Sequence, residues 1–85
     1  MQTTIRYFAS VRETVGLGSE TLDLPDSLST LAEVRVWLAA RSSRHALALG
    51  QDKPLRMACD HIMAGPESPW IAGHEVAFFP PVTGG

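Results

Sequence analysis

The sequence has 85 residues, of which 45% are hydrophobic and 19% are charged. This length suits one domain, and the composition is typical of a folded globular chain. The formal net charge is −2, and the seven basic residues are too scattered to form a stripe for a nucleic-acid backbone. No apolar run approaches the roughly 20 residues that cross a bilayer, and the amino terminus has no signal pattern. We therefore expect a cytoplasmic protein that binds neither nucleic acid nor membrane.

The first part of the chain predicts a β-hairpin with a long connection. Residues 3–8 alternate, with Ile5 and Tyr7 on one side, as in a half-buried strand. Residues 20–24 alternate again and predict the second strand. Within the connection, residues 10–15 are expected to form a helical turn.

A main helix is predicted to begin at Thr30. Thr30 and Glu33 have the spacing of a capping box, in which each side chain binds the other residue's free backbone N–H. The helix should run to about Ala40, because apolar and polar residues separate at helical spacing. The apolar face contains Leu31, Val34, Leu38 and Trp37, and the other sides contain Glu33, Arg35 and Arg41.

A shorter helical turn is predicted over residues 45–49, and Gly50 is expected to close it in the left-handed conformation. Three cationic side chains lie just before or within it: Arg41, Arg44 and His45. We interpret them as complements to the dipole at the end of the main helix.

Strands are predicted again in the second half of the chain. Residues 55–60 alternate, a turn or short strand follows at residues 62–63, and residues 75–79 form the last strand. The order β-β-α-β-(β)-β predicts an α+β roll, with one main helix across one face of a mixed sheet of four to five strands. The roll should comprise residues 1–79 and leave residues 80–85 as an extended tail.

The tail has features of a presented terminus. The last ten residues have no charged side chain, so their one ionised group is the terminal carboxylate. Pro80 and Pro81 lack N–H donors and favour an extended arm, which reaches about 20 Å at roughly 3.3 Å per residue. Gly84 and Gly85 have no Cβ, so a narrow channel can close around them. We expect the tail to carry its carboxylate into another protein.

The chemistry of a terminal carboxylate requires activation. Conversion to an acyl-adenylate allows a sulfur nucleophile to displace AMP, which leaves a nucleophilic thiocarboxylate on Gly85. A frayed glycine terminus is the alternative explanation of the two glycines. The adjoining residues 78–83, Phe-Phe-Pro-Pro-Val-Thr, favour the activated tail.

The ending Val76-Ala77-Phe78-Phe79-Pro80-Pro81-Val82-Thr83-Gly84-Gly85 resembles that of the small, sulfur-carrying subunit of molybdopterin synthase, in the ThiS/MoaD ubiquitin-like superfamily. Weaker similarities occur at residues 7–9, 11–13, 38–40 and 46–49. The chain departs from the family pattern at residues 58–61, Ala-Cys-Asp-His, where Asp60 can still make an Asx-type turn. It departs again at residues 65–71, where Trp70 replaces a smaller aliphatic residue.

The resemblance implies a β-grasp fold and a protein that is not a catalyst by itself. An activating enzyme would use ATP to adenylate Gly85 and then sulfurate it. The sulfur would pass to cyclic pyranopterin monophosphate in a complex with the large subunit, as a heterotetramer. No cofactor is expected to bind the chain itself.

Partner-binding residues are predicted on the tail and on the sheet face that the helix does not cover. Alternation places aromatic residues on that face, and a methionine lies in the turn before the last strand. The predicted set is Phe8, Met63, Phe79, Pro80, Pro81, Val82 and Thr83. The alternative is that the aromatic residues complete a two-sided core.

No metal site is predicted. Cys59 is the single cysteine, which excludes an internal disulfide. It would share a strand face with His61, near Asp60, but two ligands do not complete a site, and His45 and His74 have no ligand spacing. A buried cysteine usually packs as a small hydrophobic residue.

Two other functions remain open from the sequence. The same terminal chemistry would serve a carrier for thiamine or another thio-compound, or a modifier joined to lysines. A purely structural interaction domain would never activate its tail.

Overall fold

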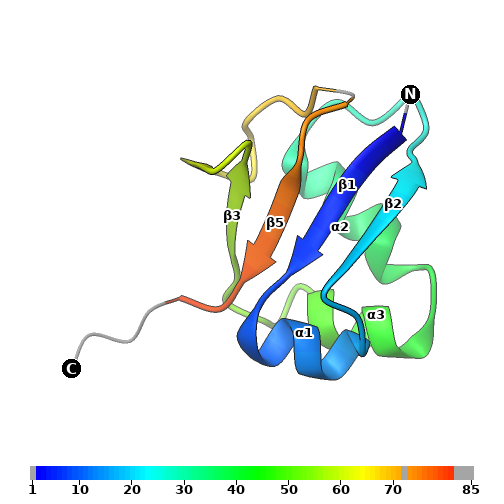
Figure 1. The fold of residues 1–85 in the computed structure, drawn as a ribbon, viewed down its shortest axis with the longest axis vertical. Coiled ribbons are helices and arrows are strands. Elements are labelled where there is room, and N and C mark those ends of the chain that lie inside the picture. The colour runs from blue at the N-terminus through cyan, green and yellow to red at the C-terminus, as the bar shows by residue number, and fades with distance from the viewer. Residues whose placement is uncertain (1, 72, 82–85) are drawn as a thin grey trace.

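The computed structural model describes residues 2–71 and 73–81. These residues form eight elements: β1 (Gln2–Tyr7), α1 (Ala9–Val15), β2 (Ser19–Asp23), α2 (Leu31–Ala39), α3 (Ser43–Leu49), β3 (Arg56–Cys59), β4 (Ile62–Ala64) and β5 (Val76–Phe79). Figure 1 shows how they are arranged. The predicted strands and both short helical turns are confirmed, with boundaries that differ by one or two residues. No helix among the described residues is long and apolar enough to span a bilayer.

The strands form one five-stranded mixed sheet in the order β2-β1-β5-β3-β4. β1 and β5 pair in parallel, and the other neighbours are antiparallel. α2 lies across one face of the sheet, while α1 and α3 lie at the end where β1 and β5 finish (Figure 1). The predicted α+β roll is therefore confirmed.

The core lies between the sheet and the helices. Its fully buried residues include Ile5, Tyr7, Leu31, Val34, Leu38, Val76 and Phe78. Alternation explains the strand members, because Ile5 and Tyr7 pair with Val76 and Phe78 and their side chains leave the same face. Each such side chain contributes roughly 1.5–3 kcal/mol by leaving water.

The start of α2 has the predicted capping box. The Thr30 side chain accepts a hydrogen bond from the Glu33 backbone N–H at 3.2 Å, and Glu33 Oε1 accepts one from the Thr30 N–H at 3.1 Å. These bonds satisfy N–H groups that no helical carbonyl can reach, and they fix where the helix begins.

The prediction that Arg35 occupies an outer side of α2 is wrong. Its side chain is buried, and its guanidinium donates to three backbone carbonyls: Leu49 O at 2.8 Å, Gly50 O at 2.5 Å and Lys53 O at 2.7 Å. Helical periodicity sorts residues by polarity and takes no account of unpaired carbonyls in a distant loop. Arg35 therefore connects α2 to the loop that follows α3.

The prediction of a left-handed Gly50 is also wrong. Gly50 has φ −59° and ψ 155°, which is extended backbone and not the left-handed conformation. Its carbonyl accepts from Arg35, so the end of α3 is satisfied by a side chain from another helix instead of by a local left-handed turn.

The helix-dipole interpretation is wrong for His45. This residue is buried within α3, and its Nε2 lies 2.8 Å from Glu20 Oε2. α2 has no basic residue in its last turn, and Arg41 lies beyond the cap at Ala40. The Arg41 guanidinium lies 5.4 Å from the centre of the Trp37 ring.

The segment that departs from the family pattern forms a tight hairpin and a packed connection. Asp60 and His61 have φ of 49° and 68°, which joins β3 to β4 through a two-residue turn of the kind that follows strand twist. The Asp60 carboxylate accepts from the Glu75 N–H at 2.8 Å, so it binds across the fold and not in a local Asx turn. Trp70 is buried in the core, and its backbone N–H donates to Ser29 O at 2.9 Å.

Candidate functional site

The chain leaves the sheet from a central strand. β5 ends at Phe79, and Pro80 and Pro81 are the last described residues. Neither proline has an N–H donor, so neither can continue the hydrogen-bond ladder of the sheet. The Phe8 N–H donates to Phe78 O at 3.2 Å, so the end of β1 lies beside the start of the tail.

The predicted acceptor residues Gly84 and Gly85 lie outside the described residues, and so do Val82 and Thr83. Their predicted roles stay predictions.

Three of the predicted partner-binding residues, Phe8, Met63 and Phe79, have their side chains on the same face of the sheet, the one opposite the core. Phe8 is extended, so it follows Arg6 onto this face, and the Arg6 guanidinium lies 5.8 Å from the centre of its ring. Phe79 leaves β5 on the same side because Phe78 points into the core. Met63 joins them from β4. Phe8 is 44% exposed and Met63 60% exposed, whereas Phe79 is partly buried.

The strand register makes these residues part of a continuous surface. Ala77 of β5 pairs with Ala58 of β3, which pairs with Met63 of β4. We call the residues Phe8, Ala58, Met63, Ala77 and Phe79 the outer patch. Ala58 and Ala77 are buried, so Phe8, Met63 and the partly buried Phe79 provide its accessible surface. Helices cover the other face, so the outer patch is the side of the sheet open to a partner (Figure 1).

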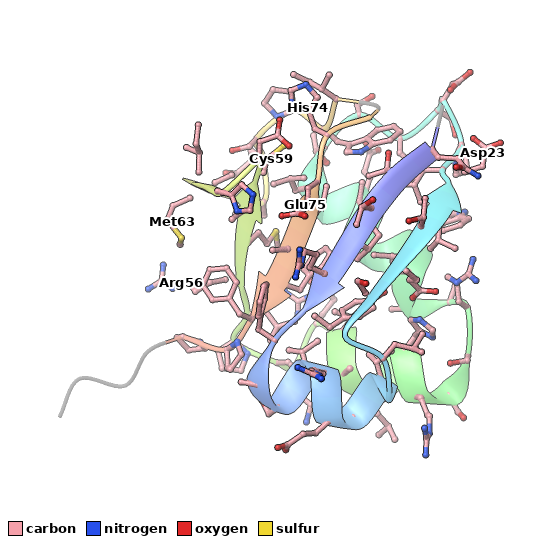
Figure 2. The ribbon with its side chains drawn as sticks, in the orientation of Figure 1. Asp23, Arg56, Cys59, Met63, His74 and Glu75 are labelled. Atoms are coloured by element: carbon pink, nitrogen blue, oxygen red, sulfur yellow. The ribbon has the colours of Figure 1, made fainter. Side chains whose placement is uncertain are left out.

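Charged side chains border the outer patch. Arg56 pairs with Phe79 in the ladder, and Figure 2 shows Arg56 and Met63 pointing away from the sheet on its β3–β4 side. Arg56 makes no ion pair with the residues that the structure describes. On the opposite border is Glu75. Its Oε1 lies 3.4 Å from Arg6 Nη1, and its Oε2 lies 3.5 Å from His61 Nε2. An apolar centre with a polar rim is the usual anatomy of a protein interface.

The covered face contains a polar cluster that sequence reasoning missed. The Tyr7 hydroxyl donates to Glu20 Oε2 at 2.7 Å, and His45 Nε2 lies 2.8 Å from the same oxygen. Ser42 Oγ lies 2.7 Å from His45 Nδ1, and Arg41 lies 4.0 Å from Glu20 Oε1. The cluster ties β2 to α3. One sequence signal could have indicated it: Glu20 lies two residues before Leu22, so alternation places its carboxylate on the inward face of β2.

The electrostatics of this cluster stabilise the ionised carboxylate. Burial acts to raise the pKa of Glu20, but hydrogen bonds from His45 and Tyr7 and the charges of His45 and Arg41 outweigh it, so this pKa lies below its ordinary value. Burial, followed by the bond to Glu20, raises the pKa of Tyr7. The tyrosine therefore remains a neutral donor.

The structure does not assemble the cysteine and histidine into a site. Cys59 ends β3 and is partly buried, while His61 lies in the turn with a positive φ. Burial and the neighbouring Asp60 charge raise the pKa of the Cys59 thiol, which disfavours the nucleophilic thiolate. Within residues 2–71 and 73–81, no three His, Cys, Asp or Glu side chains gather as metal ligands.

Comparison with known proteins agrees with this fold. The model of the ThiS family matches residues 5–85. The molybdopterin synthase sulfur carrier subunit of Escherichia coli (strain K12) is 41% identical over 81 residues, which are 95% of this chain and 96% of the relative.

Two solved structures share the architecture over their whole length and that of this chain. SAMP1 from Haloferax volcanii superposes with a TM-score of 0.78 at 22% identity. One chain of the complex of subunits 1 and 2 of the molybdopterin-converting factor from Helicobacter pylori 26695 superposes with a TM-score of 0.62 at 20% identity. At these identities the likeness concerns the fold.

The fold defines the class first: a ubiquitin-like β-grasp protein with its carboxyl end leaving a central strand. Within that class the chain belongs to the ThiS family, among the molybdopterin synthase sulfur carrier subunits.

Proposed function

We propose that this protein carries sulfur for molybdenum cofactor biosynthesis on the carboxylate of Gly85. The observation that carries the proposal is the uncharged diglycine ending, which follows two prolines at the exit from β5. The 41% identity to the Escherichia coli sulfur carrier subunit supports it.

The chemistry proceeds in two stages on the terminal carboxyl group of Gly85. The carboxylate oxygen of Gly85 attacks the α-phosphate of ATP on an activating enzyme, and pyrophosphate leaves. A sulfur nucleophile then attacks the acyl carbon of the adenylate, and AMP leaves with the electron pair of the broken C–O bond. Gly84 gives the enzyme access, because it has no side chain to block the channel.

The role of the folded domain, residues 1–79, is to bring the tail to successive partners. The outer patch docks on the activating enzyme and then on the large subunit of molybdopterin synthase, where the thiocarboxylate donates sulfur to cyclic pyranopterin monophosphate. Phe79, Pro80, Pro81, Val82 and Thr83 bind the same partners in this proposal. The carrier supplies no catalytic side chain. The Helicobacter pylori complex of subunits 1 and 2 supports a heteromeric assembly, which we take to be a heterotetramer in the cytoplasm.

Reconstitution tests the destination of the sulfur. The thiocarboxylated protein is mixed with the large subunit and cyclic pyranopterin monophosphate, and the dithiolene product is measured against the unmodified protein. We expect product only with the thiocarboxylated form. Delivery to a thiazole-forming enzyme, or attachment of the chain to lysines, with no dithiolene product would contradict the proposal and favour a thiamine carrier or a modifier.

A further inference from the structure

A concave surface lies beside the start of the tail, and none of the outer-patch residues lines it. It is a groove of about 320 Å³ between α1, α3, the loop of residues 50–55 and the first tail residues. Its walls are mostly apolar and include Val11, Leu47, Lys53, Leu55, Pro80 and Pro81. This volume accommodates one or two apolar side chains.

One wall of the groove is held in place from within the fold. The buried Arg35 guanidinium donates to the carbonyls of Leu49, Gly50 and Lys53, at either end of the loop. The Lys53 N–H also donates to Gly50 O at 3.0 Å. A surface that is already ordered loses little conformational entropy when a partner binds.

The lining of the groove indicates the chemistry of its occupant. Leu47 is 62% exposed on the rim, so its apolar surface gains most from being covered. Among the described residues, Lys53 is the one charged side chain of the lining. Its ion pair with Asp52 is 3.8 Å long between exposed side chains, and such a pair is easily exchanged for another carboxylate.

The groove is continuous with the path of the tail. Pro80 and Pro81 form part of its wall, so a protein that encloses the chain from these prolines onward must also reach the groove. We propose that the groove is a second docking point for the large subunit of molybdopterin synthase, which encloses the tail for sulfur delivery, and that it takes an apolar side chain with a carboxylate beside it. This inference rests on the proposed function, because that function requires the tail to be enclosed.

The test measures binding of the full-length protein to the large subunit of molybdopterin synthase by calorimetry. Leu47→Arg places a cation in the groove from an exposed position, so the fold is kept. We expect the Kd to rise about tenfold, as at other contacts that are covered on binding. Val36→Arg is the matched control, since Val36 is 56% exposed on α2 and outside the groove. Its Kd should stay within about twofold of the wild-type value.

Charge reversal at Lys53 tests the carboxylate. Lys53→Glu should raise the Kd about fivefold at low salt, with a difference that shrinks as ionic strength rises. Lys53→Arg keeps the charge and should bind as the wild type does.

Three results overturn the inference. If Leu47→Arg binds as Val36→Arg does, the groove takes no part in docking. If the wild type sediments as a dimer and Leu47→Arg dissociates that dimer, the occupant of the groove is a second copy of the chain. If Leu47→Arg takes up sulfur faster than the wild type, the occupant is the tail of the same chain. In all three cases the wild type still becomes a thiocarboxylate, whereas failure of the proposed function appears as no sulfur uptake by the wild type.

Discussion

The two faces of the sheet use apolar side chains for different ends. On the covered face, Ile5, Tyr7 and Phe78 are fully buried under helices, and the Tyr7 hydroxyl donates to Glu20. On the open face, Phe8 and Met63 remain exposed, and Arg56 pairs with Phe79. The difference teaches that apolar surface stabilises the fold on one side and is available for a partner on the other. Mutations on the two faces should therefore separate stability from binding.

The largest expected effect is on the covered side. Arg35→Met removes the donor for three loop carbonyls and should lower the free energy of unfolding by about 3 kcal/mol, because buried acceptors are left unpaired. Arg56→Met makes the same chemical change on the open face and should alter it by less than about 0.5 kcal/mol. Urea unfolding measures both. Equal losses in the two variants would remove the distinction between the faces.

The next effect is on the open face. Phe79→Arg places a charge in the outer patch and should weaken binding to the activating enzyme and the large subunit about thirtyfold, or about 2 kcal/mol. Met63→Arg, at a more exposed position, should act in the same direction with almost no change in unfolding. Binding is measured by calorimetry on variants whose circular dichroism is unchanged. Folded variants that bind both partners normally would show that the patch does not dock.

The smallest effect is the pH dependence that Glu20 imparts. Its pKa is lower in the folded protein than in the unfolded chain, so its stabilisation is present above the unfolded pKa and is lost as pH falls through the folded one. Glu20→Gln should cost about 1 kcal/mol at pH 7, and the difference from wild type should vanish in acid. Urea unfolding midpoints measured across pH give this difference, and Glu13→Gln, at an exposed position of α1, is the control. If the stability difference between wild type and Glu20→Gln were the same at all pH values, the ionised Glu20 carboxylate would not be the source of the stabilisation.

Local patterns predicted the elements because their causes are local. The capping box needs only Thr30 and Glu33, and alternation assigns Phe78 and Phe79 to opposite faces of their strand without knowledge of the sheet order. Arg35 was misplaced because its acceptors lie 14 to 18 residues away along the chain. His45 was misplaced for the same reason, since its partner Glu20 lies on β2.

Three members of the outer patch, Phe8, Met63 and Phe79, were predictable from the sequence, and its shape was not. Alternation put Phe8 and Phe79 on the uncovered face, but their adjacency depends on the parallel pairing of β1 with β5, which no local signal specifies. The groove beside Leu47 was missed entirely, because it forms only where two helices, a loop and the tail meet.

The mass of the terminus is the most direct test of sulfur carriage. The protein is incubated with the activating enzyme, ATP and a sulfur source, and intact mass is recorded beside the Escherichia coli relative as a positive control. We predict that one oxygen of Gly85 is replaced by sulfur in the wild type, and that neither deletion of Gly85 nor an added residue after it permits the change. An unmodified wild type in a reaction that converts the control, or sulfur found on Cys59 instead, would contradict the account.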